Sequence, residues 1–86
     1  MIKIDDILES KEVVEYLKSR GISEQYRKAR DMIIGGFPQK FDFKLRKPKI
    51  EKVYQFRINK KYRAFGFFRY EGGKNLFLIT KISDHQ

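Results

Sequence analysis

Residues 53–70 read VYQFRINKKYRAFGFFRY, and this stretch carries the strongest indication of the fold class. Residues 53–58 and 62–70 are rich in the aromatic and apolar residues that favour strands, and residues 59–61 between them are polar and suit a tight turn. The stretch therefore predicts an antiparallel β-hairpin. Because Lys and Arg are interleaved with the aromatic residues, we also expect cations along the hairpin.

The strand pattern continues on both sides of this hairpin. Residues 71–75 contain two glycines and predict a turn, and residues 76–82 predict a last strand that begins almost entirely apolar, so we expect it to lie centrally or to be covered on both faces. Apolar and polar residues alternate over 41–45, which predicts a further strand. Residues 46–49 predict a loop, because Pro48 cannot donate to a strand ladder. The sequence thus indicates an antiparallel meander.

The first part of the chain has helical signals instead. Asp6 as N-cap, followed by Glu9, predicts a first helix, which Gly21 is placed to end. Ser23 is expected to cap a second helix over residues 24–34. Two helices joined by so short a connection predict a helical hairpin.

Helices at one end of the chain and strands at the other predict an α+β fold. We expect the helical hairpin to pack on one face of a small antiparallel sheet, and we expect residues 1–86 to form one domain. The opposite face of the sheet would then be free for a ligand.

The charge of the chain is unevenly distributed. Residues 1–43 contain eight basic and eight acidic residues, whereas residues 44–86 contain twelve basic and three acidic residues and so carry the whole net charge of +9. Most exposed lysines are ordinary solvated side chains, but Arg57, Lys60, Lys61 and Arg63 are concentrated on two predicted strands and their turn. Such a cluster favours a polyanionic partner.

Composition excludes several other classes of protein. The chain has no cysteine, which rules out disulfides and thiolate metal sites, and one histidine with scattered carboxylates predicts no metal site and no cofactor. No apolar run approaches the roughly 20 residues that cross a bilayer, and the N-terminus lacks a signal-peptide core. We therefore expect a cytoplasmic protein with no membrane partner.

Several segments together resemble the RelE/ParE toxin superfamily of toxin–antitoxin modules. These segments are the predicted helix pair, the stretch 53–58, the Lys60-Lys61-Tyr62-Arg63 turn, the aromatic strand after it and the closing stretch 78–85. The resemblance implies a compact RelE-like toxin fold with a twisted sheet and a short first strand at residues 1–4. It also implies a cognate antitoxin as partner. In the RelE branch the sheet enters the A site of the 30S ribosomal subunit and cleaves mRNA without a metal, leaving a 2′,3′-cyclic phosphate.

The resemblance also assigns candidate site residues. Arg57 and Arg63 match basic positions of two neighbouring strands, His85 matches the Arg or His at the end of the last strand, and Lys60 and Lys61 supply further charge. From composition, we expect a wider set of residues to bind nucleic acid: Arg46, Lys47, Lys49, Lys52, Tyr54, Arg69 and Lys81. His85 near the chain end has a second interpretation as a solvated side chain, and Tyr54 has one as a half-buried sheet residue.

One residue departs from the family pattern and keeps other functions open. Gln55 stands where many active members have Lys or Glu, and a neutral amide cannot act as a base. The chain also ends at Gln86, without the aromatic residue that often follows the terminal catalytic position. The alternatives are a non-catalytic nucleic-acid-binding or interaction protein on the same fold and a ParE-like inhibitor of DNA gyrase.

Overall fold

A five-stranded sheet forms one layer of the molecule. The structure is a computed structural model and describes residues 3–84. Its strands are β1 (Asp6–Glu9), β2 (Lys44–Leu45), β3 (Tyr54–Arg57), β4 (Arg63–Glu71) and β5 (Lys74–Ser83), in the spatial order β1-β5-β4-β3-β2. Strands β2 to β5 form the predicted antiparallel meander, and β1 pairs in parallel with β5. The α+β class is confirmed, and the sheet is mixed rather than wholly antiparallel.

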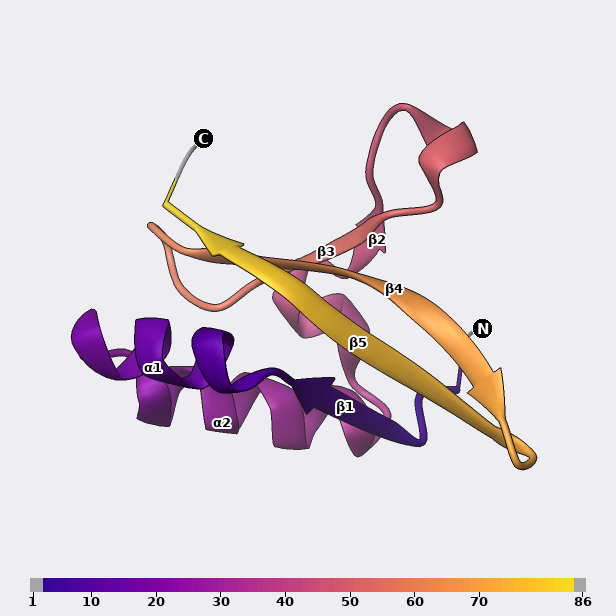
Figure 1. Cartoon of the computed structure of the whole chain (residues 1–86), viewed down its shortest axis with the longest axis horizontal. Helices are drawn as coiled ribbons and strands as arrows, with labels where there is room; N and C mark the ends of the chain where they lie inside the picture. The colour runs from indigo at the N-terminus through magenta and orange to yellow at the C-terminus, as the bar shows by residue number, and fades with distance from the viewer. Residues whose placement is uncertain (1–2, 85–86) are drawn as a thin grey trace.

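Two helices form the second layer, as predicted. Helices α1 (Lys11–Ser19) and α2 (Ser23–Ile34) run along one side of the sheet in Figure 1. Helix α1 ends in a Schellman motif, in which the amides of Gly21 and Ile22 donate to the carbonyls of Lys18 and Leu17. Gly21 has φ +68°, a conformation that glycine adopts without strain.

The N-terminal boundaries differ from the sequence prediction. Asp6 lies in strand β1 and caps no helix; α1 begins after Ser10, whose hydroxyl accepts a hydrogen bond from the Val13 amide at 3.2 Å. Ser23 is the first residue of α2 and not its cap. The short first strand lies at Asp6–Glu9 rather than at residues 1–4, and residues 1–2 lie outside the described part. Pairing with β5 outweighs the local capping signal, because a strand of four residues is fixed by its partner.

The strand predicted over residues 41–45 is also shorter than expected. Residues Pro38–Phe41 form a 3-10 turn, and only Lys44–Leu45 pair with β3. Phe43 is drawn into the aromatic cluster instead, where its ring centroid lies 5.1 Å from that of Phe77. Packing of this partly buried ring against the core stabilises the fold more than two further ladder hydrogen bonds on an edge strand.

The core lies between the helices and the sheet. Ile7, Ile33, Phe56 and Phe77, from β1, α2, β3 and β5, are the largest fully buried side chains in residues 3–84. As expected, the apolar strand β5 has a neighbour on each side. This packing uses one face of the sheet only, so the other face remains open. Across the described residues, no helix is long and apolar enough to span a membrane.

Candidate functional site

Strand alternation assigns the side chains of β3, β4 and β5 to two faces. Phe56, Ala64 and Ile82 are in register across the three strands and belong to the core. Their sequence neighbours therefore point to the opposite, open face.

Arg57, Arg63 and Ser83 form the first cross-strand row on the open face. Arg57 is directly opposite Arg63 on β3 and β4, and Arg63 is opposite Ser83 on β5. Like charges directly opposite each other in a sheet are destabilising. The Arg57–Arg63 pair is therefore expected to bind an anion.

Lys44, Gln55, Phe65 and Lys81 form the second row, on four neighbouring strands. Phe65 is 9% exposed but is not part of the core cluster. The Arg46 guanidinium covers it, with its central carbon 4.9 Å from the ring centroid. This cation–π contact places a further positive charge above the open face.

We call Arg46, Arg57, Arg63 and Lys81 the cation cluster. None of the four forms an ion pair with a carboxylate of residues 3–84, whereas Arg30, Lys44 and Arg69 each do. The cluster thus combines four unneutralised charges on one surface. Phosphate groups carry the negative charge that would complement such a surface.

The turn between β3 and β4 adds Lys60 and Lys61 next to this cluster. The side-chain carbonyl of Asn59 accepts hydrogen bonds from the Lys61 and Tyr62 amides, both at 2.8 Å. Its amide nitrogen donates to Gln25 on α2 at 2.7 Å. The turn is therefore fixed to the helical layer, and both lysines are exposed.

Other predicted binding residues lie elsewhere. Lys47, Lys49 and Lys52 are exposed on the β2–β3 loop. Tyr54 lies on the core face, where its ring centroid is 4.9 Å from that of Phe68, so the interpretation as a half-buried sheet residue fits its position. Arg69 is six residues along β4 from Arg63, about 20 Å away at strand spacing, and pairs with Glu71.

His85 lies outside the described residues, so its predicted role stays a prediction. No group of side chains within residues 3–84 is arranged to hold a metal ion.

Two residues of this face were not foreseen as part of a site. The sequence presents Gln55 only as a departure from a family pattern, and Phe65 only as part of an aromatic strand. The available signal was the strand period of two, because Gln55 is two residues from Arg57 and Phe65 is two residues from Arg63.

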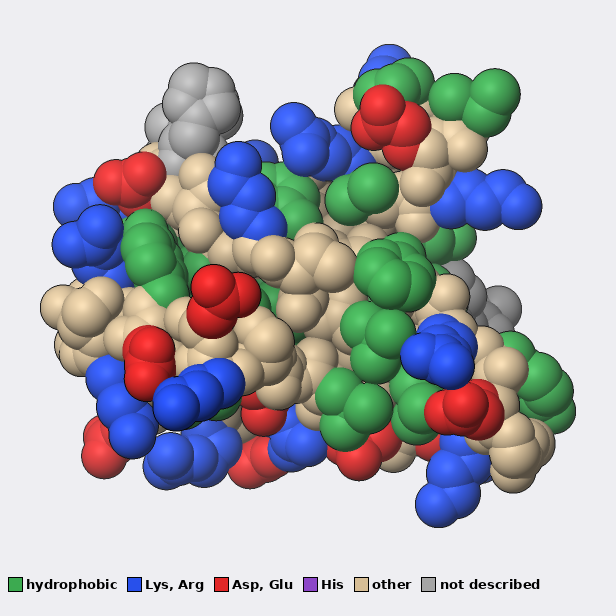
Figure 2. Space-filling model, in the orientation of Figure 1, with side chains coloured by type: hydrophobic (Ala, Val, Ile, Leu, Met, Phe, Trp, Pro, Cys, Tyr) green, Lys and Arg blue, Asp and Glu red, His purple; other side chains and the backbone are tan. Residues whose placement is uncertain are grey.

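The far end of the open face is apolar. Leu8, Phe67 and Leu78 are cross-strand neighbours on β1, β4 and β5, and 41% of Leu8 and 42% of Phe67 are exposed. Figure 2 shows hydrophobic side chains gathered over β4 and β5, with Lys and Arg side chains near the C-terminal end of β5. The open face therefore has a basic end and an apolar end.

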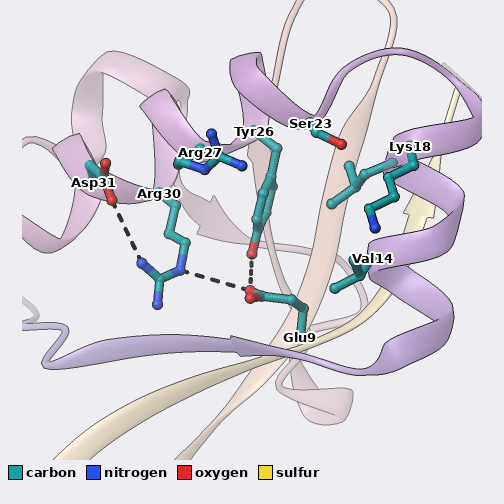
Figure 3. A pocket seen from close by; sticks show the side chains of 9 residues that line it. Glu9, Val14, Lys18, Ser23, Tyr26, Arg27, Arg30 and Asp31 are labelled. Atoms are coloured by element: carbon teal, nitrogen blue, oxygen red, sulfur yellow. Dashed lines mark hydrogen bonds and ion pairs between the residues drawn. The ribbon is translucent and has the colours of Figure 1, made fainter.

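A separate pocket lies between β1 and the two helices, and the carboxylates that line it are already paired (Figure 3). The Tyr26 hydroxyl donates to Glu9, and Arg30 forms ion pairs with Asp6, Glu9 and Asp31. Burial, and then the hydrogen bond to the Glu9 carboxylate, raise the pKa of Tyr26 well above its ordinary value.

Arg30 also occupies a backbone hydrogen-bonding group on β1, the edge strand of the sheet at this pocket. Its Nε and Nη2 atoms donate to the Ile7 carbonyl at 3.1 and 3.0 Å. A satisfied carbonyl is no longer available to an incoming strand. The paired side chains of this pocket, Glu9, Tyr26 and Arg30, are thus best explained as contributing to the stability of the fold.

One solved structure with this fold is a YoeB/ParE toxin from Agrobacterium tumefaciens. It aligns with a TM-score of 0.61 and 14% sequence identity over 94% of this chain and 99% of that chain. No protein-family model and no curated protein matches the sequence. At this identity the likeness shows a shared fold, and it confirms the fold that the resemblance to RelE/ParE toxins implied.

Proposed function

We propose that this chain is the toxin of a toxin–antitoxin module and inhibits translation by ribosome-dependent cleavage of mRNA. The observation that carries the proposal is the cation cluster on the open face, opposite the face covered by the helices. The shared fold with a YoeB/ParE toxin adds support by analogy.

The proposed reaction is attack of a ribose 2′-hydroxyl on the adjacent phosphate, which gives a 2′,3′-cyclic phosphate and a free 5′-hydroxyl. Charge builds up on the phosphate oxygens during the attack, and Arg57 and Arg63 are placed to stabilise it. Two guanidinium groups can hold the phosphate through parallel hydrogen bonds, as lysine cannot. The reaction needs no metal when side chains supply the charge.

Proton transfer is assigned to the basic groups near this pair. His85 is proposed to protonate the departing 5′-oxygen, because imidazole titrates near neutral pH. In sequence it follows Ser83 by two residues, and Ser83 is the cross-strand partner of Arg63. Lys60 or Lys61, on the turn that joins β3 and β4, is proposed as the group that takes the 2′-hydroxyl proton.

The proposed partners are the ribosome with mRNA in its A site and a cognate antitoxin. An acidic or amphipathic antitoxin segment would neutralise the cation cluster. It could also cover the apolar end of the same face, where Leu8 and Phe67 are exposed.

Expression of the chain alone in bacterial cells, followed by mapping of mRNA ends, tests the proposal. Growth arrest with new cuts within translated codons is the expected result, and an added ribosome inhibitor that empties the A site should abolish the cuts. Growth arrest with gyrase-dependent DNA breaks would instead identify a ParE-like inhibitor.

A non-catalytic binding protein on the same fold is the second candidate, and Gln55 favours it. The amide provides no base in the middle of the open face. Retained RNA binding without new mRNA ends or growth arrest would identify this second function.

A further inference from the structure

Gln55 is the one polar or charged residue within residues 3–84 that is buried, with 8% of its surface exposed. It lies on β3 on the open face, two residues before Arg57 and directly opposite Phe65. A buried amide ordinarily has hydrogen-bond partners within the protein.

The Gln55 amide has no such partner among the described residues. None of the hydrogen bonds, ion pairs or ring contacts of the described side chains involves the Gln55 amide, and none of the described polar side-chain atoms is both enclosed and unpartnered. The amide therefore reaches solvent through the small exposed part of the residue. It is a hydrogen-bonding group at the floor of the open face, available to a ligand.

The surroundings of the amide restrict what can bind it. Lys44 and Phe65 flank it in the second row, and Arg57 follows it on its own strand. Its Nε2 atom donates two hydrogen bonds, and its Oε1 atom accepts. A bare phosphate group offers acceptors alone, so it would leave Oε1 without a donor. A full match needs a ligand that carries a neutral donor beside its phosphate.

The ribose 2′-hydroxyl of RNA is such a group. It is a donor and an acceptor next to a phosphodiester, and it distinguishes RNA from DNA. Phe67 follows Phe65 by two residues on the same face and is 42% exposed, which offers an aromatic surface to an unstacked base. A single strand matches these features better than a duplex, because its bases are free to stack on the sheet.

We propose that Gln55 is the residue that selects RNA over DNA, by binding a ribose 2′-hydroxyl whose neighbouring phosphate lies on Arg57 and Arg63. The proposal rests on the proposed function in taking nucleic acid as the ligand of this face. It assigns a role in recognition to the residue that lacks a role as base.

Three single-stranded oligonucleotides of one sequence test this role: RNA, DNA, and 2′-O-methyl RNA, which keeps the oxygen but lacks the donor. Binding is measured by fluorescence anisotropy at low salt with the unaltered protein, Gln55→Met and Gln39→Leu. Methionine nearly matches glutamine in shape, and Gln39 is exposed on the Pro38–Phe41 turn. Melting curves check that each variant is folded.

The unaltered protein and Gln39→Leu should bind RNA about fivefold to tenfold more tightly than the other two strands, the effect of one hydrogen bond. Gln55→Met should bind all three strands alike. The 2′-O-methyl strand tests the same contact without a substitution, should Gln55→Met fail to fold.

Two results would overturn the role of Gln55 while leaving nucleic-acid binding intact. One is equal affinity of the unaltered protein for all three strands, and the other is an RNA preference that survives in folded Gln55→Met. Failure to bind any of the strands would overturn the nucleic-acid function together with this inference.

Discussion

The proposed function depends mainly on two side chains, Arg57 and Arg63. They face each other across β3 and β4, and neither has a carboxylate partner within residues 3–84. In the free protein this pair repels and lowers stability slightly. A bound phosphate attracts both guanidinium groups, and this attraction offsets their mutual repulsion.

Arg63→Ala should abolish growth arrest and mRNA cleavage while the protein stays folded. A lost transition-state contact of this kind costs about 3 kcal/mol, or roughly a hundredfold in rate. Arg69→Ala is the matched control, because Arg69 lies on the same strand but pairs with Glu71 at the other end. Mapped mRNA ends and growth curves measure both effects.

A fully toxic Arg63→Ala variant would remove this residue from the site. An unfolded variant would show instead that Arg63 serves the fold, which thermal melting of the purified protein detects.

The hydroxyl of Tyr26 is expected to contribute to the stability of the fold. Tyr26→Phe removes the hydrogen bond to Glu9 and should lower the free energy of unfolding by about 1 to 3 kcal/mol at neutral pH. The raised pKa of Tyr26 means that the folded state keeps the proton while the unfolded state loses it above about pH 10.

The stabilisation by Tyr26 is therefore complete below about pH 10 and declines as the pH rises further. Urea denaturation of the two proteins from pH 7 to 11 should show their difference shrinking at the alkaline end. A difference that stays constant over this range would contradict the raised pKa.

At the scale of elements, the β4–β5 hairpin determines the shape of the open face. A register shift between Phe65 and Gly66 leaves Thr80 as an extra residue on β5, and the Thr80 hydroxyl donates to the Phe65 carbonyl at 3.3 Å. Such a bulge bends and twists the strands locally. It brings Lys81 opposite Phe65 and so completes the second row.

Gly66→Ala should be strongly destabilising, by about 3 kcal/mol or more. A Cβ atom at Gly66 would lie 2.2 Å from the Leu78 carbonyl oxygen, and this backbone atom cannot move without breaking the β4–β5 ladder. Thermal or urea denaturation measures the loss.

Gly72→Ala in the turn of the same hairpin is the control. There the added Cβ meets nothing within 4 Å, and the cost comes from φ +59° alone, about 1 kcal/mol. Equal effects of the two substitutions would show that the bulge tolerates a side chain.

At the scale of the whole molecule, charge is divided between the two layers. The first half of the chain, which forms the helical layer and β1, has no net charge, and the second half carries +9. A polyanion is therefore attracted toward the sheet and its loops rather than toward the helices.

Binding to single-stranded RNA should weaken with salt, with log K falling by about 0.7 per log unit of salt for each phosphate contacted. Charge reversal at Lys47 and Lys49 should reduce this slope. The same reversal at Lys11 and Lys18 on α1 should leave it unchanged. Anisotropy titrations over a range of salt concentrations measure the slopes, and a flat salt dependence of the unaltered protein would contradict a polyanionic ligand.

Features that depend on neighbouring residues could be predicted from the sequence. Helical and strand periods, Gly21 at a helix end and the polar turn at 59–61 are local signals, and they predicted the α+β class and the meander. The uneven charge was likewise visible without a structure, because it is a sum over residues.

Contacts between residues far apart in the chain became evident from the tertiary structure alone. Strand β1 exists because it pairs with β5, some 70 positions later in the chain, and this pairing overrode the local helix signal at Asp6. Gln55, Phe65 and Lys81 share one row because of strand register and the bulge, and neither is encoded in any short stretch. Cross-strand register depends on packing of the whole sheet against the helices, so the composition of the site followed from the fold and not from any single segment.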